Sequence, residues 1–295
     1  MKLYKNWFLA SRPWSFSMTA ISVSVGTVLG ALEGDLSWTL YFLTLFGMVV
    51  LHAATNLMND YYDVRGGVDY EEVSTAQYRP HPILGMKLDP LQVRNGALLL
   101  YGVATVIGLY LAVLRGWELL LVGAIGVFAS LTYTAPPFKY KYKALGEFSV
   151  FLMWGPFMVT GAYFVQRQSF SASAALISLP FGMLVALVLL ANNIRDIPHD
   201  RSKGILTLPI LLGQRNGLHL YFAIVLLAYF SIFLMSVLGP LSPWSLLIFL
   251  SLPLAFQLLR KMVREIPINA DALTARLNTT FGILILLSLV LEAAF

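Results

Sequence analysis

Nine apolar segments, each about as long as a bilayer is thick, constrain this chain more than any other feature of its sequence. They cover residues 14–32, 38–62, 93–114, 117–135, 147–166, 172–194, 217–238, 244–260 and 274–294. A helix needs about 20 apolar residues to cross the hydrocarbon core of a bilayer. Because 58% of the 295 residues are hydrophobic and only 12% are charged, we predict an all-α membrane protein with nine transmembrane helices in a single domain, residues 1–295.

The basic residues are distributed unevenly between the loops. Of the 20 Lys and Arg residues, 18 lie in the N-terminal segment and in the loops after the second, fourth, sixth and eighth apolar segments. Only Arg115 and Arg167 lie on the other side. Because basic residues are retained in the cytoplasm during insertion, we expect a multi-pass protein of the cell membrane with a cytoplasmic N-terminus and an outside C-terminus. The long polar loops 64–92 and 197–216 are then both cytoplasmic.

The net charge of +5 is explained by such loops facing anionic lipid. The partner that this charge predicts is therefore the lipid bilayer. No basic stripe with interleaved aromatic residues occurs outside the loops, so the sequence predicts no nucleic-acid partner.

A short motif recurs at the ends of two apolar segments. Asn59-x-x-x-Asp63 ends the second segment, and Asn192-x-x-x-Asp196 ends the sixth, 133 residues later in both positions. The equal offset indicates two four-helix units related by duplication, followed by a ninth helix, arranged around a central cavity. Such a fold would bring both motifs into that one cavity.

Both motifs belong to larger polar clusters. At helical spacing, one face of the second segment carries Asn56, Asn59, Asp60 and Asp63, and one face of the sixth carries Asn192, Asp196 and Asp200 if the helix persists past Pro198. Carboxylates near hydrocarbon are costly and normally mark a functional site with a cationic partner. Since oxygen ligands without Cys or paired His favour a hard ion, the clusters predict Mg²⁺ that clamps a diphosphate. Nearby basic residues would neutralise the remaining charge: Arg79, Lys139, Lys141, Lys143, Arg201 and Lys203.

A site of this kind also predicts a reaction. Stabilising a departing pyrophosphate lets an allylic C–O bond ionise toward a carbocation, while the apolar bundle holds an isoprenoid tail. Aromatic rings could stabilise the cation, with packing as their alternative role: Tyr61, Tyr62, Tyr133, Trp154 and Tyr163. His52 has no second His at ligand spacing, which favours a hydrogen-bonded core histidine over a catalytic one. For the acidic clusters, the alternative interpretation is a pair of solvated helix ends.

At these residues the sequence resembles the UbiA superfamily of intramembrane prenyltransferases, whose two Asp-rich motifs end the second and sixth of nine helices. The spacing Asn59-Asp60-x-x-Asp63-x5-Asp69 resembles the branch that prenylates dihydroxynaphthoate in menaquinone synthesis. Arg12-Pro13, Arg79-Pro80 and residues 133–138 are similar to that branch as well. One stretch departs from it. Many relatives have Gly-Lys-x-Thr-Leu where this chain has Gly-Ile-Leu-Thr-Leu at 204–208, with Lys203 before the glycine.

The resemblance implies roles for individual residues. The metal ligands that we expect are Asn59, Asp63, Asp69, Asn192, Asp196 and Asp200, and the expected catalytic carboxylates are Asp60, Asp63, Asp196 and Asp200. The expected contacts to the substrate are Asn56, Arg79, Tyr133, Lys139, Lys141 and Lys203. The two polar loops are expected to form a cap that excludes water from the reacting cation.

Three functions remain open at this point. The leading hypothesis is an enzyme that uses Mg²⁺ to transfer a prenyl group from an isoprenoid diphosphate to an aromatic acceptor, 1,4-dihydroxy-2-naphthoate. The first alternative keeps the chemistry with another acceptor: a hydroxybenzoate, a chlorophyllide, a haem or a glycerol phosphate lipid. The second alternative is a transporter or lipid-binding protein whose acidic helix ends hold ions. Prenyl chain length, the number of metals, the general base and the oligomeric state do not follow from the sequence.

Overall fold

The computed structural model describes residues 2–70 and 78–294, and every extended element in those ranges is a helix. The one β-type contact in the described ranges is an isolated bridge between Lys143 and Leu206. The prediction of an all-α chain is therefore confirmed. Part of the predicted loop 64–92, residues 71–77, lies outside the described residues.

Eight helices in the described ranges are long and apolar enough to cross a membrane. They are η1–α2 (Pro13–Leu32), α3 (Trp38–Arg65), α5 (Pro90–Arg115), α7–η3–α8 (Gly146–Arg167), α9 (Ala172–Arg195), α12 (Gln214–Leu238), η4–α13 (Pro243–Arg264) and α14 (Ala270–Ala294). These eight coincide with eight of the nine apolar segments of the sequence. The remaining segment forms α6 (Glu118–Thr132), whose 15 residues span only about 22 Å at about 1.5 Å per residue. Because the hydrocarbon core is about 30 Å thick, nine complete spans stay a prediction.

Short helices lie outside these spans. They are α1 (Lys2–Ala10), η2 (Tyr140–Tyr142), α10 (Ile197–Ser202) and α11 (Leu208–Leu212). The predicted loop 197–216 is thus largely helical. Pro198 occupies the first turn of α10, where a missing N–H is tolerated, so the proline separates α9 from α10 instead of lying within one helix.

Local sequence explains where the long helices begin. Side-chain oxygens of Ser37, Asp89 and Ser171 accept hydrogen bonds from the backbone N–H three residues later, at 3.4, 2.9 and 3.3 Å. These residues cap α3, α5 and α9, because each side chain satisfies an N–H that has no partner inside the helix. The caps fix the N-terminal ends of α3 and α9, and the polar motifs lie at the C-terminal ends of the same helices.

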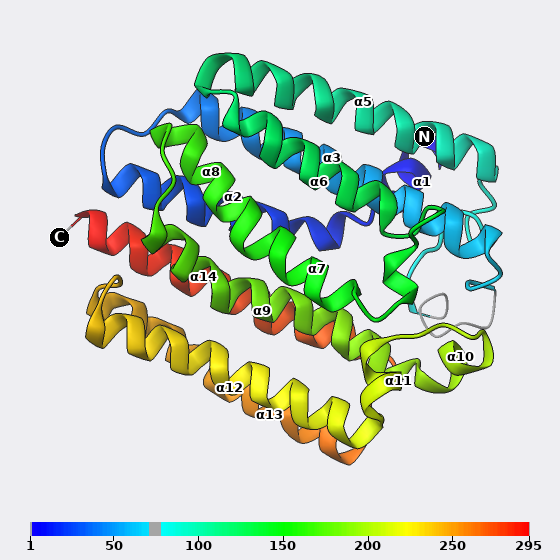
Figure 1. Cartoon of the computed structure of the whole chain (residues 1–295). Helices are drawn as coiled ribbons and strands as arrows, with labels where there is room; N and C mark the ends of the chain where they lie inside the picture. The colour runs from blue at the N-terminus through cyan, green and yellow to red at the C-terminus, as the bar shows by residue number, and fades with distance from the viewer. Residues whose placement is uncertain (1, 71–77, 295) are drawn as a thin grey trace.

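The helices alternate in direction, so chemically distinct loops gather at opposite ends of the bundle. Figure 1 shows the C-terminal ends of α3, α6 and α9 at the same end as α10, α11 and the beginning of α14, whereas the C-terminus lies at the other end. This is the arrangement that the distribution of basic residues predicts for one side of a membrane. Which side faces the cytoplasm stays a prediction.

A large apolar core joins the two halves of the chain. Ile21 of α2, Phe181 of α9 and Phe281 of α14 are buried in one cluster. A Cβ on Gly282 would lie 2.5 Å from Ile21 Cγ2 and 2.8 Å from Phe181, so any larger residue would force these side chains to move and would disturb the close packing of α14. This core packs α2 against helices of the second half, and the arrangement as two four-helix units with a ninth helix stays a prediction.

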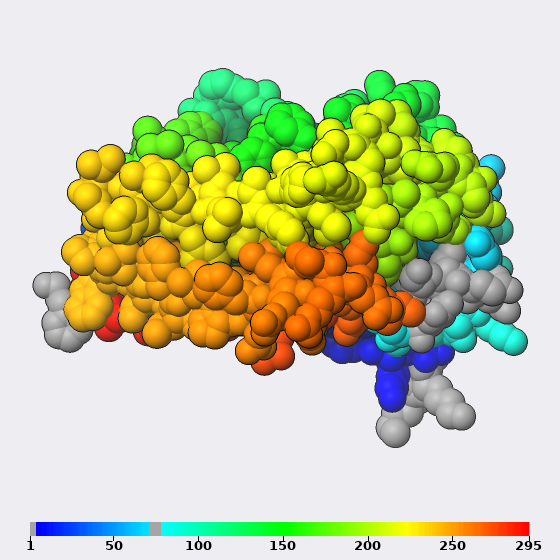
Figure 2. All heavy atoms as spheres, turned by 90° about the horizontal axis from the view of Figure 1, so that it is seen from below, coloured from blue at the N-terminus to red at the C-terminus, as the bar shows by residue number. Residues whose placement is uncertain are grey.

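One outer face of the molecule is formed by α12 and α13, which lie side by side in Figure 2. Large apolar side chains are exposed on these helices, among them Leu226, Phe230 and Phe256. A soluble protein rarely exposes so much contiguous apolar surface, whereas lipid tails cover it without cost. The face therefore supports a multi-pass membrane protein, and it leaves α2, α3, α5–α9 and α14 to enclose the interior.

Candidate active site

A cavity of about 690 Å³ runs along the bundle between α2, α3, α5, α6, η3–α8, α9 and α14. At one end its walls carry Asp63, Asp196 and Asp200. Toward the other end they carry apolar residues such as Leu111, Leu119 and Val165. Thr44 also lines it, 19 residues before Asp63 on the same helix, which corresponds to a depth of about 28 Å. The cavity is thus polar at the loop-rich end and apolar across most of the bundle.

The motif at the end of α3 is held by two side chains from the segment after α6. Lys141 Nζ donates to Asp63 Oδ2 at 2.7 Å and to Asn59 Oδ1 at 3.1 Å. The hydroxyl of Tyr142 donates to Asp63 Oδ1, and Asn59 Nδ2 donates to Asp63 Oδ2 at 2.9 Å. Burial and the adjacent Asp63 carboxylate raise the pKa of Tyr142 above its ordinary value. Asn59, Asp63 and Lys141 therefore meet as the sequence predicts, and Tyr142 is an addition.

The motif at the end of α9 is organised by Arg195. Its guanidinium donates to both oxygens of Asp196, at 2.8 and 2.6 Å, and to Asn192 Oδ1 at 2.7 Å. It also donates to Asp271 Oδ1 of α14 at 3.2 Å. A planar fork that binds several acceptors at once fixes their orientation. Asn192 and Asp196 both line the cavity that Asn59 and Asp63 line, so the two repeated motifs do share one chamber.

Asp200 of α10 is the least compensated carboxylate of the site. It lines the cavity and is buried, and its side chain makes no hydrogen bond or ion pair with the described residues. Burial and the adjacent Asp196 carboxylate raise the pKa of Asp200 to about 7. The charges of Asp63 and Asp69 act in the same direction. A concentration of negative charge of this kind favours the binding of a cation.

Asp60 does not line the cavity with Asn59 and Asp63. It is fully buried outside the cavity lining and forms an ion pair with Arg12. One oxygen, Oδ2, has no hydrogen-bond partner among the described residues. Consecutive residues of an α-helix are turned by about 100°, so Asp60 points away from Asn59. The expectation that Asp60 shares one face with Asn59 and Asp63 is not met, and its place suits a residue that positions Arg12.

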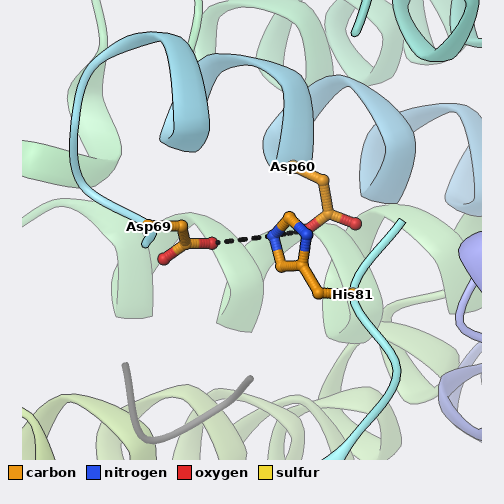
Figure 3. Close-up of side chains that lie close together, drawn as sticks. All are labelled: Asp60, Asp69 and His81. Atoms are coloured by element: carbon orange, nitrogen blue, oxygen red, sulfur yellow. Dashed lines mark hydrogen bonds and ion pairs between the residues drawn. The ribbon is translucent and has the colours of Figure 1, made fainter. Parts of the chain in front are cut away.

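Asp60, Asp69 and His81 form a second group whose oxygen and nitrogen atoms lie within 4.8 Å of one another (Figure 3). The Nδ1 atom of His81 accepts from the backbone N–H groups of Ile83 and Leu84 at 3.3 and 3.2 Å. This pattern assigns the proton to Nε2, which donates to Asp69 Oδ2 at 3.3 Å. Burial alone would raise the pKa of Asp69, but the hydrogen bond from His81 and the charge of Lys141 lower it. Both ring nitrogens of His81 and one oxygen of Asp69 are therefore hydrogen-bonded, whereas Oδ2 of Asp60 is not.

The other predicted contact residues fall into two sets. Those that line the cavity are Asn56, Asp69, Arg79 and Tyr133. Lys139 and Lys203 are exposed and do not line it. Lys203 Nζ instead lies 4.6 Å from the ring centroid of Tyr70. Residues 204–208 lack the lysine that many similar proteins have after the glycine. Lys203 does not replace it, because its side chain lies outside the cavity.

The loops around the polar end contact one another. His199 Nε2 donates to the backbone carbonyl of Val68 at 2.9 Å, and its Nδ1 lies 3.2 Å from the hydroxyl of Tyr70. The backbone N–H of Ala144 donates to Leu206 at 2.8 Å. Segments after α3, α6 and α9 therefore join above the carboxylates. That these loops form a cap over the cavity stays a prediction.

Sequence reasoning missed several residues of the cavity. Asp271 and Arg12 were not assigned a role, and His52 was interpreted as a core residue. His52 does line the cavity, although its Nδ1 lies 2.8 Å from Thr19 Oγ1 and its Nε2 lies 3.2 Å from Ser15 Oγ. A role for Arg12 could have been predicted from the Arg12-Pro13 pair, which is part of the family resemblance. For Asp271 the sequence offers only a single carboxylate at the beginning of the last apolar segment.

The donor set fits a hard divalent cation. Asp63, Asp69, Asp196 and Asp200 bring carboxylate oxygens to one end of the cavity, and Asn59 and Asn192 add amide oxygens. Mg²⁺ prefers such oxygen ligands and keeps positions for water and phosphate. Asp200 has free lone pairs, whereas Asp63 and Asp196 still accept hydrogen bonds from Lys141 and Arg195. These residues could hold a metal together with a diphosphate.

Comparisons with known proteins agree with this geometry. Residues 19–290 match the UbiA prenyltransferase family. The chain is 33% identical to 1,4-dihydroxy-2-naphthoate octaprenyltransferase of Bacillus subtilis over 96% of this chain and 91% of that protein. It is 30% identical to human UbiA prenyltransferase domain-containing protein 1, over 98% and 84% of the two chains.

Solved structures give the same result for the fold. The structure of a UbiA homolog from Aeropyrum pernix K1 superposes with a TM-score of 0.69 at 15% identity, covering 94% of this chain and 97% of that chain. A UbiA homolog from Archaeoglobus fulgidus, bound to GPP and Mg²⁺, superposes with a TM-score of 0.61 at 13% identity, covering 95% and 99%. With two repeated acidic motifs in one intramembrane cavity and a family match over nearly its whole length, this chain belongs to the UbiA prenyltransferase family.

Proposed function

We propose that the protein transfers a prenyl group from a magnesium-bound isoprenoid diphosphate to 1,4-dihydroxy-2-naphthoate. One observation carries the proposal: Asp63 of α3 and Asp196 of α9 line the same cavity, which continues as an apolar chamber through the bundle. The polar end suits a diphosphate and the apolar chamber suits its hydrocarbon tail. A single elongated site with both properties is what an isoprenoid diphosphate requires.

The relatives support the choice of substrates. The Archaeoglobus fulgidus homolog has been solved with DMAPP and Mg²⁺ and with GPP and Mg²⁺. The name of the Bacillus subtilis relative gives a naphthoate acceptor. We propose that this chain uses the same classes of donor and acceptor, and that it requires Mg²⁺.

At the polar end, the chain's own residues would bind and neutralise the leaving group. Mg²⁺, when bound, supplies positive charge to the pyrophosphate oxygens. The proposed ligands are Asn59, Asp63, Asp69, Asn192, Asp196 and Asp200. Lys141, which lies on the Asp63 carboxylate, would move onto a phosphate oxygen, and the hydroxyl of Tyr142 would donate beside it. Charge stabilisation that is strongest on the departing group lowers the barrier to C–O cleavage.

Water has to be kept from the allylic cation. The contacts of His199 with Val68 and Tyr70 link the segments after α3 and α9, and we propose that these segments exclude water from the cavity. Among the five aromatic residues considered from sequence, Tyr133 and Trp154 line the cavity. Their ring faces are the candidates for stabilising the cation. Tyr61, Tyr62 and Tyr163 do not line it.

The tail would lie along α5, α6 and α8. Gly126 of α6 lines this part of the cavity, and a Cβ placed on it would meet no atom within 4 Å. Gly126 lies seven residues from Tyr133, which is about 10 Å along the helix. An isoprene unit contains four main-chain carbon bonds of about 1.5 Å, so this glycine lies near the second or third unit of a bound tail.

The acceptor is the part of the proposal that needs a direct experiment. Purified protein with Mg²⁺ and a labelled prenyl diphosphate should form a prenylated product with 1,4-dihydroxy-2-naphthoate. Hydroxybenzoate, chlorophyllide, haem and a glycerol phosphate lipid, tested in parallel, should give less product. Absence of product from dihydroxynaphthoate, together with product from another acceptor, would keep the enzyme class and reject this acceptor.

We also propose that α6 is the ninth membrane span and that the polar end faces the cytoplasm. Both motif-bearing helix ends lie at that end in Figure 1, and the residues at and after these ends, 64–94 and 195–215, carry eight of the 20 Lys and Arg residues. Labelling of single cysteines added to the two termini of this cysteine-free chain would test the orientation in intact cells. Labelling of a C-terminal cysteine from outside, but not of an N-terminal one, is the expected result.

A further inference from the structure

A network of hydrogen bonds lies in the cavity wall, one helical turn farther into the bundle than Asn59. Asn56 precedes Asn59 by three residues, which is about 4.5 Å along α3, and both residues line the cavity. Asn56 Nδ2 donates to the backbone carbonyl of Ser11 at 3.0 Å and to Ser15 Oγ at 3.2 Å. A carbonyl can only accept, so the nitrogen of the amide, and not its oxygen, has to face Ser11. Both N–H groups of Asn56 are therefore used, whereas its Oδ1 makes no hydrogen bond with the described residues.

The hydroxyl of Ser15 continues the network to a histidine. It donates its single hydrogen to the backbone carbonyl of Arg12 at 2.7 Å. Ser15 Oγ can then only accept from His52 Nε2, 3.2 Å away, so the proton of His52 is assigned to Nε2. Trp154 Nε1 donates to Thr19 Oγ1 at 3.2 Å, and the Thr19 hydroxyl, 2.8 Å from His52 Nδ1, donates to that nitrogen. His52 is thus satisfied as a neutral imidazole, with both nitrogens hydrogen-bonded.

These assignments decide what the network can offer to a ligand. His52 has no free lone pair, so it is not available to remove a proton from a substrate. Ser15 Oγ accepts two hydrogen bonds and donates one, which uses its full capacity. What remains is Asn56 Oδ1, a neutral oxygen that accepts hydrogen bonds. Such an oxygen repels the oxygens of a diphosphate and binds a hydroxyl, so this position suits the aromatic substrate and not the prenyl donor.

The surroundings of Asn56 fit an aromatic ring. The rings of His52 and Trp154 lie 5.0 Å apart in an edge arrangement, and both residues line the cavity. Met48, about two turns farther into the bundle along α3, also lines it, so the wall becomes apolar beyond the amide. In the other direction, one turn away, lies Asn59, where the diphosphate would be bound. A ring with its hydroxyl on Asn56 would therefore lie close to the bond between the pyrophosphate and the prenyl group.

We infer that Asn56 Oδ1 accepts a hydrogen bond from a ring hydroxyl of the aromatic substrate. His52 is a positioning residue, because through Ser15 it holds the Asn56 amide with its oxygen free for that hydroxyl. The inference rests on the proposed function. It adds the position of the aromatic substrate and its chemical class, a ring that carries a hydroxyl able to donate.

The two monomethyl ethers of 1,4-dihydroxy-2-naphthoate test this, because each has one hydroxyl that can no longer donate. The ethers are measured as substrates, or as competitive inhibitors if they are not prenylated. With the wild type, we expect one ether to bind about three- to tenfold more weakly than dihydroxynaphthoate, as for loss of one hydrogen bond. Asn56→Ala should weaken the binding of dihydroxynaphthoate and of the other ether by the same factor, but that of the first ether by less than about twofold. This pattern would show that Asn56 and one particular hydroxyl bond to each other.

Further measurements separate this role from a place in the metal or diphosphate site. In Asn56→Ala, the KM for the prenyl diphosphate and the Mg²⁺ concentration that gives half the maximal rate should change less than about twofold. Asn56→Ser has a side chain too short to reach the same hydroxyl. It is the reserve variant if Asn56→Ala does not fold, and it should give the same pattern. Asn216→Ala removes an exposed asparagine side chain of α12 outside the cavity lining, and it should alter none of these values.

Variants of His52 test its positioning role. His52→Phe keeps a ring but cannot donate to Ser15, so it should weaken the binding of dihydroxynaphthoate by a smaller factor, with the same dependence on one hydroxyl. His52→Gln can again donate to Ser15 and should recover part of the loss. A loss in His52→Phe that is equal for both ethers would refute the positioning role.

Equal loss of affinity for dihydroxynaphthoate and for both ethers in Asn56→Ala would overturn the inference, because a structural defect does not depend on one hydroxyl. A raised KM for the prenyl diphosphate or a raised Mg²⁺ requirement, with unchanged affinity for dihydroxynaphthoate, would overturn it as well. A wild type that forms no product from dihydroxynaphthoate would refute the proposed aromatic substrate itself. That outcome is recognised before any variant is made, so the two failures are distinguishable.

Discussion

Replacing Asp200 by asparagine is expected to stabilise the metal-free protein while removing its activity. Burial and Asp196 raise the pKa of Asp200 to about 7, against about 3.9 for an ordinary aspartate. Because the folded-state pKa lies above the unfolded-state value, ionised Asp200 opposes folding. This cost is complete above pH 7 and disappears as the pH falls toward 4.

The structure sets the size of the effect. A difference of about three pKa units corresponds to about 4 kcal/mol at about 1.4 kcal/mol per unit, which is an upper limit for Asp200→Asn above pH 7. Asparagine keeps the shape and carries no charge. In a chain of 295 residues, a few kcal/mol correspond to several degrees in melting temperature.

The assay is thermal unfolding of the detergent-solubilised protein at pH 8, with EDTA or with excess Mg²⁺. With EDTA, Asp200→Asn should melt several degrees above the wild type. Excess Mg²⁺ should raise the melting temperature of the wild type more than that of the variant, because ligand binding stabilises the folded state in proportion to its affinity. Asp35→Asn changes an exposed carboxylate outside the cavity lining and serves as the control.

Two results would refute this reasoning. One is an Asp200→Asn variant that melts at or below the wild type in EDTA at pH 8. The other is a wild type whose metal-free stability does not rise relative to the variant as the pH is lowered from 8 toward 5. Either result would mean that Asp200 is not an uncompensated carboxylate in the folded protein.

Further predictions concern the metal, the repeated motif and the tail. Asp63→Ala and Asp196→Ala should each reduce kcat by more than about 100-fold with unchanged expression and helix content, because a metal ligand is lost; near-normal turnover in both would contradict the ligand assignment. EDTA should stop product formation and excess Mg²⁺ should restore it, and activity that survives chelation would rule out the metal requirement. Gly126→Phe should favour geranyl over longer diphosphates in a mixed-substrate assay read by mass spectrometry. Gly102→Phe is the control, because Gly102 also has open space around its Cβ but lies outside the cavity lining, and it should not change the preference. A product distribution in Gly126→Phe that matches the wild type would contradict the path of the tail.

The membrane helices were predictable because their signal is local and repeated over many residues. The apolar segment 172–194 became α9, Ala172–Arg195, with Ser171 as its cap. The repeated Asn/Asp motif was also sufficient to bring α3 and α9 together at one cavity. Segment 117–135 forms a shorter helix than the other segments. Its hydropathy resembles that of the others, but Gly116 and the turn after Thr132 restrict the helix to 15 residues.

The site was predictable only where residue type and helical spacing decide the outcome. Asn59 and Asp63 line the cavity as expected, but Asp60 pairs with Arg12, a choice that depends on how the N-terminal segment packs against α3. Asp271 could not be foreseen for the same reason, since its partners Tyr78 and Arg195 come from distant parts of the chain. Lys139 and Lys203 were expected from charge and proximity in sequence, and neither property determines where a long side chain points.

The change of polarity along the cavity affects how the two products of prenyl transfer would separate. The pyrophosphate would be formed beside Asp63 and Asp196, under loops held together by a few hydrogen bonds, and it would diffuse into water when those loops part. The prenylated ring would carry its tail in the apolar half and would pass sideways into the lipid. The reverse reaction would need pyrophosphate and the prenylated product in the cavity at the same time. Because one product would be in water and the other in lipid, their separation would disfavour the reverse reaction in addition to its chemical equilibrium.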